Sequence, residues 1–224
     1  MGSSDSKVSV SSASPGITLP VAFNLYYKRS WGLKFRLGEH DSAIVYSAGL
    51  PLGWNGDLIV YGGPSSDDAP LATVRWASAR GDSAVTLPSP APGVPQIVEE
   101  LRNNSSMLHT SHQFTIAVSA GPFPQPQKFE WRQASSDELE PLGESSRGWK
   151  LMYGNEIVAL WANASIGRHV SKTARFMFVN SGATGEFGQT WALMAVVTFL
   201  RLWQLQMQSL MTSAASGNAI TSVV

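Results

Sequence analysis

Residues 187–207 read FGQTWALMAVVTFLRLWQLQM, a nearly continuous apolar run in a chain otherwise rich in short strands and turns. The stretch from Trp191 to Leu205 contains only three polar residues, Thr198, Arg201 and Gln204. A helix that is apolar on every side belongs in a membrane or in the centre of a protein. The run is shorter than the roughly 20 residues needed to cross a bilayer, and it contains Arg201. We therefore predict a helix at about 186–209, buried by the rest of the chain, and no transmembrane span.

The sequence before this helix predicts short β-strands. In Lys128–Arg132 (KFEWR), for example, apolar and charged residues alternate strictly, as on a half-buried strand. Repeated short strands with turn signals indicate a sandwich or a barrel, and only a closed barrel supplies a channel for an apolar helix. The expected fold class is mainly β (α+β), a closed antiparallel β-barrel of about ten to twelve short strands around a hydrophobic C-terminal helix. Expected strands are 21–28, 33–37, 57–61, 71–76, 84–87, 107–118, 128–132, 149–153, 156–162 and 175–179, while 97–103 fits either a short helix or a strand.

The chain divides into one domain and two tails. Residues 1–16 are Ser-rich and are expected to be a disordered tail. Residues 17–211 form a single barrel domain, and residues 212–224 form a flexible C-terminal tail. Within the domain, 88–95 is predicted to be an extended Pro-rich loop and 134–147 a solvated hairpin loop.

The entry into the central helix is predicted from glycines. The segment SGATGEFG, residues 181–188, contains Gly182, Gly185 and Gly188, which let the chain turn from the sheet rim into the barrel. The segment lacks the lysine of a P-loop and the spacing of a dinucleotide-binding loop. Thr184 is expected to cap the helix, with Glu186 in its first turn.

Composition limits the function classes. The 224 residues carry a formal net charge of zero and only 14% are charged, so we expect no nucleic-acid partner. There is no cysteine, which excludes disulfides and cysteine-ligated metals. His109 and His112 are three residues apart and point to opposite faces of a strand, so we predict no metal site. No motif indicates a cofactor, and without a signal peptide we expect a cytoplasmic protein.

Gly2 is a candidate lipidation site. Met1-Gly2 followed by Ser6 fits the N-myristoylation pattern, although a Ser-rich tail also matches that pattern by chance. A single acyl chain gives only marginal membrane binding. Acylation of Gly2 would make the protein a peripheral membrane protein.

Charged residues supply weaker candidates. Lys28, Arg29, Lys34 and Arg36 gather on one predicted hairpin, either as a surface for an anionic headgroup or as an ordinary solvated face. Glu130 and Arg132 share a strand face, where they form a surface ion pair if they point outward or an acid–base pair if they point into a cavity. Arg201 must reach the barrel mouth or meet a carboxylate, because an unpaired buried charge is costly. His40, Asp41 and His169 occur in no recognisable triad pattern, and no catalytic residue is assigned.

Several segments resemble a known family. They are Phe129-Glu130-Trp131-Arg132, Glu156–Leu160, and Ser181–Gly188 running into Trp191–Met194 and Leu200–Trp203. These segments resemble the fungal tubby C-terminal-like proteins, relatives of the tubby domain, the plant LURP-one-related proteins and the phospholipid scramblases. The resemblance implies an antiparallel barrel closed around a hydrophobic C-terminal helix. It carries over no phosphoinositide-binding motif.

Two functions remain open. The first is a non-catalytic intracellular tubby-like module that binds a lipid, a membrane surface or a protein partner. The second is a cofactor-free isomerase or cyclase of the pericyclase type, from fungal small-molecule biosynthesis (secondary metabolism), with an aromatic-lined pocket for an apolar molecule. An aromatic pocket beside the central helix favours the enzyme, and a tight barrel with a charged rim favours the module.

Overall fold

The computed structural model describes residues 17–27, 30, 32–91, 93–106, 109–118, 124–143, 147–164 and 171–220. Lys28, Arg29 and His169 lie outside this part of the chain, as does the predicted N-terminal tail with Met1, Gly2 and Ser6.

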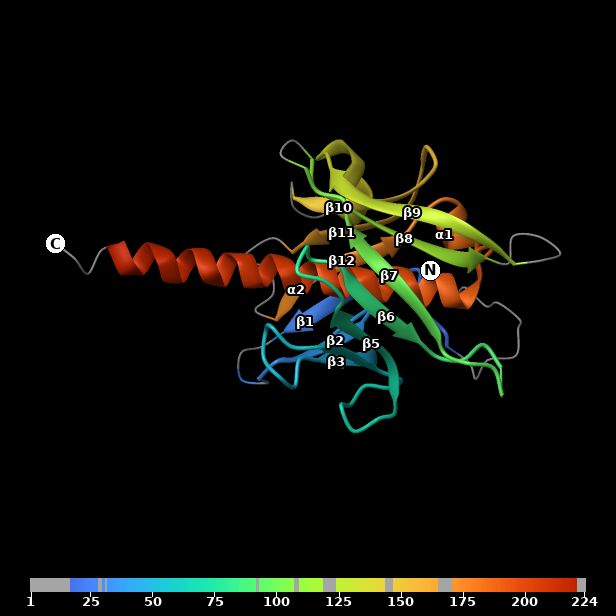
Figure 1. Ribbon diagram of the computed structural model, residues 1–224, viewed down its shortest axis with the longest axis horizontal. Coiled ribbons are helices and arrows are strands. Elements are labelled where there is room, and N and C mark those ends of the chain that lie inside the picture. The colour runs from blue at the N-terminus through green and yellow to red at the C-terminus, as the bar shows by residue number, and fades with distance from the viewer. Residues whose placement is uncertain are drawn as a thin grey trace, which may run out of the picture.

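Twelve strands in the described residues form one closed antiparallel barrel. The order around the barrel is β1-β12-β11-β10-β9-β8-β7-β6-β5-β4-β3-β2, so each strand pairs with its sequence neighbours and β1 closes on β12 (Figure 1). The predicted fold class is confirmed. The strands are β1 Ala22–Tyr27, β2 Lys34–Gly38, β3 Ile44–Gly49, β4 Leu58–Tyr61, β5 Pro70–Trp76, β6 Ser83–Leu87, β7 Ile97–Asn103, β8 Ser111–Val118, β9 Gln125–Ala134, β10 Gly148–Tyr153, β11 Glu156–Asn163 and β12 Lys172–Phe178.

Two segments differ from the sequence-based expectations, and a third settles an assignment that the sequence left open. Strand β3 was not predicted, and the undecided segment 97–103 is strand β7. The expected hairpin loop after β9 contains the 3-10 helix η2, Asp137–Leu142. Leu139 and Leu142 of η2 are buried against the outside of the barrel, near β11 and β12. These two leucines explain why the acidic segment is ordered there.

Two helices follow the last strand: α1, Ser181–Thr184, and α2, Gly188–Ile220. Gly185 and Gly188 have φ of 82° and 84°, so glycines make the turn into the barrel as predicted. Thr184 ends α1 and does not cap α2, which corrects the predicted N-cap. The predicted end of the central helix, at about 209, is also wrong, because α2 continues through the first part of the predicted tail.

Helix α2 is the core of the barrel. From Leu193 to Gln204 its side chains are buried on every side, in one cluster with the inward residues of the strands. Aromatic rings fill the space between helix and wall; the Phe199 ring, for example, lies 5.2 Å from Trp161 and 5.3 Å from Phe176. Two apolar cavities at the wall hold about 10 Å³ each, room for about one water molecule.

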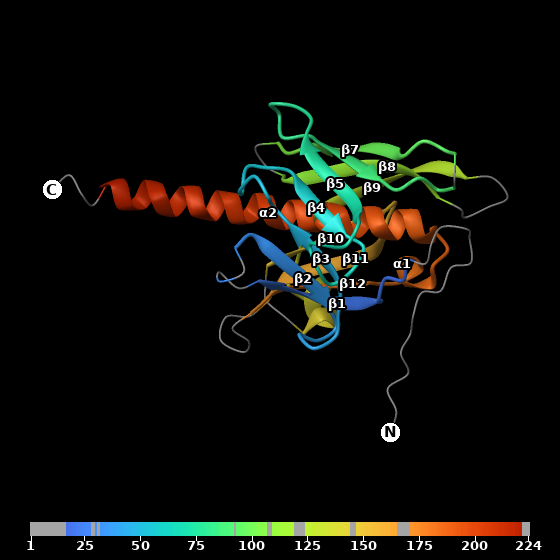
Figure 2. The ribbon, with the colours of Figure 1, turned by 90° about the horizontal axis from the view of Figure 1, so that it is seen from below.

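Beyond the barrel, α2 projects away from the strands in two perpendicular views (Figures 1 and 2). Leu205 to Gln208 are partly buried, and from Ser209 to Ser213 the side chains are exposed. Among the described residues, no helix has the length and hydropathy required to span a bilayer.

Candidate functional site at the helix exit

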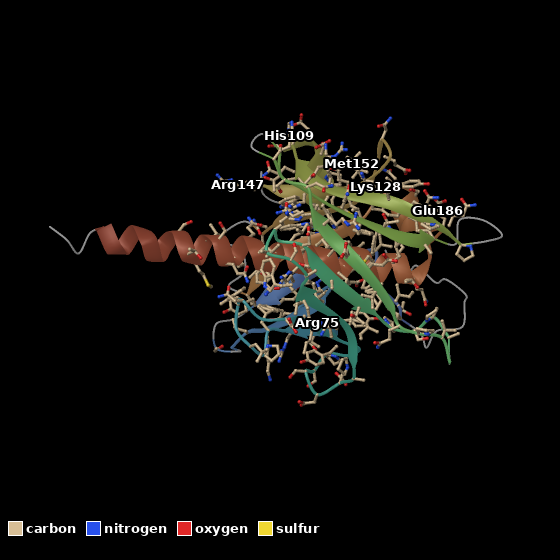
Figure 3. The ribbon with its side chains drawn as sticks, viewed as in Figure 1. Arg75, His109, Lys128, Arg147, Met152 and Glu186 are labelled. Carbon is tan, nitrogen blue, oxygen red and sulfur yellow. The ribbon has the colours of Figure 1, made fainter. Side chains whose placement is uncertain are left out.

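A cleft of about 500 Å³ opens where α2 leaves the barrel. Arg147, which lines it, and the nearby loop residue His109 lie at this end of the molecule, whereas Glu186 lies at the opposite end (Figure 3). The barrel rim and the helix build the cleft together. Its lining residues are Thr110, His112, Gln133, Ala134, Arg147, Gly148, Trp149, Leu202, Leu205, Gln206 and Ser209.

Strand alternation turns three rim side chains into the cleft. His112 shares a face with the buried Phe114 of β8, because alternate residues of a strand point the same way. Gln133 is in register with Trp149 of β10, and it continues the inward face of Trp131. The last inward position of each of three adjacent strands therefore meets α2 at the mouth.

Trp149 supplies a flat wall. Its ring is stacked on that of Trp161, with centroids 6.3 Å apart and planes at 10°. The His112 ring lies 5.7 Å from the Trp149 ring on the other strand. Leu202 and Leu205 add an apolar surface from α2. The cleft thus joins an aromatic wall to aliphatic side chains, as ligand pockets commonly do.

His112 is the titratable group of this wall. It is only 7% exposed, and burial lowers its pKa to about 4, against a weaker opposing effect from Asp82. The imidazole is therefore neutral at pH 7. Its Nδ1 atom is buried without a hydrogen-bond partner, and the same holds for Oε1 of Gln206 across the cleft. Neither atom forms a hydrogen bond with the described residues. A buried polar atom without a hydrogen bond lowers the stability of the folded protein.

Glu130 and Arg132 lie elsewhere, on the outer face of β9. Arg132 donates a 2.7 Å hydrogen bond to Glu130, while Phe129 and Trp131 are fully buried. The ion pair with Arg132 is the main reason that the pKa of Glu130 is lowered, with a smaller contribution from the Ser111 hydroxyl. Of the two alternatives that the sequence left open, the structure shows the outward ion pair. It lines a polar outer hollow of about 690 Å³, separate from the aromatic cleft.

The predicted basic hairpin is only partly described. Lys34 and Arg36 are exposed on the outer face of β2, two residues apart. Lys28 and Arg29 lie outside the described residues. The proposed anionic surface at this hairpin stays a prediction.

Arg201 meets neutral groups at the mouth. Its Nε donates to Ser83 Oγ at 3.0 Å, and its Nη1 donates to Gln204 Oε1 at 2.7 Å. The Trp76 ring covers the guanidinium. In the described part of the chain no carboxylate forms an ion pair with Arg201, although Asp57 is near enough to favour its charge. Of the two alternatives for Arg201, the carboxylate partner is therefore not found among these residues, and the side chain is paired with neutral groups instead.

The two histidines do not form a pair. His109 precedes β8 and lines the outer hollow, whereas His112 lines the exit cleft. Among the residues that the structure describes, no three His, Cys, Asp or Glu side chains gather as a metal site would require.

Sequence reasoning did not select the exit cleft. The sequence feature that could have indicated the cleft is His112 in SHQFTIAV, which lies on the same inward face as Phe114 and Ile116. A polar residue at the end of an inward face indicates a barrel mouth. Which other rim residues meet it depends on the register of β9 and β10 and on the length of α2.

These features define a closed antiparallel barrel that is plugged by its own C-terminal helix and has a ligand-sized cleft at the helix exit. No protein-family model, curated protein or solved structure matches this chain. The function is therefore inferred from the geometry of the site.

Proposed function

We propose that this protein is a non-catalytic binding module whose exit cleft holds a small amphipathic molecule. The main support for the proposal is the difference in volume between the cavities in the barrel wall and the cleft at the helix exit. The apolar wall cavities admit about one water molecule each, whereas the cleft measures about 500 Å³. Ligand sites are typically concave and mostly apolar, with a few polar groups, and occupy roughly 300–1,000 Å³. Trp149, Leu202 and Leu205 supply the apolar part of the lining, and the polar part comes from Thr110, His112, Gln133, Arg147, Gln206 and Ser209.

We propose with it a distant kinship to the tubby-like proteins. The support is architectural, namely an antiparallel barrel closed around an apolar C-terminal helix, which is the arrangement the resemblance implies. An experimental structure superposed on a tubby domain tests the kinship. The same strand order and helix direction support it, and a different order contradicts it.

A blocked-cleft variant tests the binding function. The probe is 2-naphthol, an aromatic ring with one polar group, titrated by isothermal calorimetry. Ser209 is exposed and lines the cleft, so Ser209→Trp fills the space with little disturbance of the core. The matched control is Ser213→Trp, one turn further along α2, exposed and not among the lining residues.

The expected result is one binding site in the wild type and in Ser213→Trp, and a loss of affinity of at least about tenfold in Ser209→Trp. No heat of binding in the wild type contradicts the proposal. Equal affinity in both variants also contradicts it, because the probe would then be bound elsewhere.

The neutral His112 favours a second candidate, a cofactor-free isomerase. An imidazole that is unprotonated at neutral pH can accept a proton from a carbon acid bound in the cleft, and its lowered pKa makes it a weaker base than an ordinary histidine. The test compares small-molecule extracts of the native host carrying wild-type or His112→Gln protein. Accumulation of one compound and loss of another of equal mass support the enzyme. Unchanged extracts, with cleft binding intact, favour the module.

A further inference from the structure

The exit cleft also indicates what its ligand must look like. Trp149 is fixed in orientation by its parallel stacking on Trp161, so it offers a rigid flat wall. Leu202 and Leu205 of α2 add aliphatic surface to the same cleft. A planar ring can stack on an indole of fixed orientation with little loss of side-chain freedom. The apolar part of the ligand is therefore best matched by an aromatic ring system.

The two buried polar atoms without hydrogen-bond partners indicate which polar group the ligand should have. His112 Nδ1 and Gln206 Oε1 belong to side chains on different elements, β8 and α2, which line the same cleft. An amide oxygen requires a donor, and an imidazole nitrogen donates or accepts according to its tautomer. A hydroxyl has one proton, which it donates to the amide oxygen of Gln206, and its own oxygen accepts a hydrogen bond from the imidazole tautomer that is protonated on Nδ1. It is the smallest group that satisfies both atoms at once.

The charges of the residues that line the cleft narrow the class of ligand further. Among the described lining residues only His112 and Arg147 are ionisable, and no carboxylate lines the cleft. A cationic ligand therefore finds no counter-charge and meets Arg147 at the mouth. The imidazole is neutral in the folded protein, so the buried end of the cleft offers no charge to an anion.

We infer that the cleft selects neutral planar aromatic compounds bearing a hydroxyl group, of the phenol class, through His112 and Gln206. This inference rests on the proposed binding function and adds the ligand class. It assigns to His112 and Gln206 the discrimination between a hydroxylated ring and the same ring without the hydroxyl.

The experiment compares three probes by ligand-observed NMR titration: naphthalene, 2-naphthol and 2-naphthoate. They share one ring system and differ in a single substituent. In the wild type we expect 2-naphthol to bind about tenfold more tightly than naphthalene, because pairing a buried unsatisfied group has an effect of that order. We expect 2-naphthoate to bind more weakly than 2-naphthol.

Two variants then locate the discrimination. His112→Phe keeps a ring beside Trp149, and Gln206→Leu keeps a side chain of similar length. In each, the preference for 2-naphthol should fall to about threefold or less, with naphthalene affinity retained. The matched control is Thr115→Ala, an exposed position on the outward face of β8, which should keep the full preference.

The outcomes separate the two proposals. If no probe binds the wild type, the binding function itself fails. If naphthalene and 2-naphthol bind the wild type equally, the cleft is a site but the phenol inference is overturned. Tighter binding of 2-naphthoate also overturns it and assigns the selectivity to Arg147. The wild-type comparison decides these outcomes even if a variant does not fold.

Discussion

The guanidinium of Arg201 lies 4.1 Å from the centre of the Trp76 ring, at the mouth through which α2 leaves the barrel. Arg201 is fully buried, whereas Trp76 is 42% exposed and therefore separates the cation from solvent. Burial lowers the pKa of Arg201 to about 10, so the side chain still carries its charge at neutral pH. A buried cation is thus stabilised by an aromatic face and two neutral acceptors, Ser83 and Gln204.

A double-mutant cycle tests this pair. Trp76→Leu should lower the free energy of unfolding by about 2 kcal/mol, because a desolvated cation–π contact is of that size. Arg201→Met should be nearly neutral, since an apolar side chain of similar length avoids the desolvation of a charge. In the Arg201→Met background, Trp76→Leu should cost about 2 kcal/mol less than in the wild type, because no cation–π contact is left to lose. Urea denaturation measures all four proteins, and additive effects would show that the two side chains are not coupled.

Trp131 and Thr198 join the barrel wall to the helix. The indole Nε1 of Trp131 donates a 2.9 Å hydrogen bond to the Thr198 hydroxyl, which itself donates to the Met194 carbonyl. Thr198→Val keeps the shape but leaves the indole N–H without an acceptor, at a cost of about 2 kcal/mol. Thr198→Ser keeps the acceptor and should cost about 1 kcal/mol for the lost methyl group. Thermal unfolding measures both variants, and a greater loss in the serine variant would contradict the role of the hydrogen bond.

The central helix could be predicted because its signal is local. An apolar run interrupted by Arg201 excludes a membrane span, and the strand pattern before it requires a closed wall. The partners of Arg201 could not be predicted, because Trp76 and Ser83 come from strands more than a hundred residues away. Barrel closure and strand register bring them to the helix, and neither is visible in a local pattern.

The exit cleft shows the same limit. Alternation predicts that His112 points inward, but its place at the mouth depends on where α2 crosses the rim. By contrast, the alternation of Phe129 and Trp131 with Glu130 and Arg132 was visible in the sequence, and it places the charged pair on the face opposite the core.

Substitution of Gly182 tests how tightly the chain packs where it turns into the barrel. A side-chain Cβ at this position would overlap the carbonyl oxygen of Val158 and lie 3.0 Å from the Trp191 ring. Gly182→Ala should therefore destabilise the protein by about 3 kcal/mol, as overpacking against backbone does. Gly154→Ala is the control, because that glycine has φ of 58° and open space around it, so only the backbone conformation costs about 1 kcal/mol. Guanidinium denaturation compares them, and equal losses would show that the close approach to Val158 can relax.

His112 makes stability depend on pH in a predictable direction. Its pKa in the folded protein, about 4, lies below the ordinary value of 6.5, because burial disfavours the charged imidazole. Between these values the unfolded chain binds a proton that the folded chain does not. The folded state therefore keeps its full stability above about pH 6.5 and loses it as the pH falls towards 4. The loss approaches about 3 kcal/mol, at 1.36 kcal/mol for each unit of the shift.

The measurement is the free energy of unfolding of three proteins between pH 4 and 7.5. His112→Phe should show a smaller decrease on acidification than the wild type. His109→Gln, which alters an exposed histidine, should follow the wild type. Carboxylates also titrate in this range, so the difference between the curves isolates the imidazole. Parallel curves for the wild type and His112→Phe would mean that the imidazole binds its proton equally well in the folded and unfolded chains, so that burial does not lower its pKa.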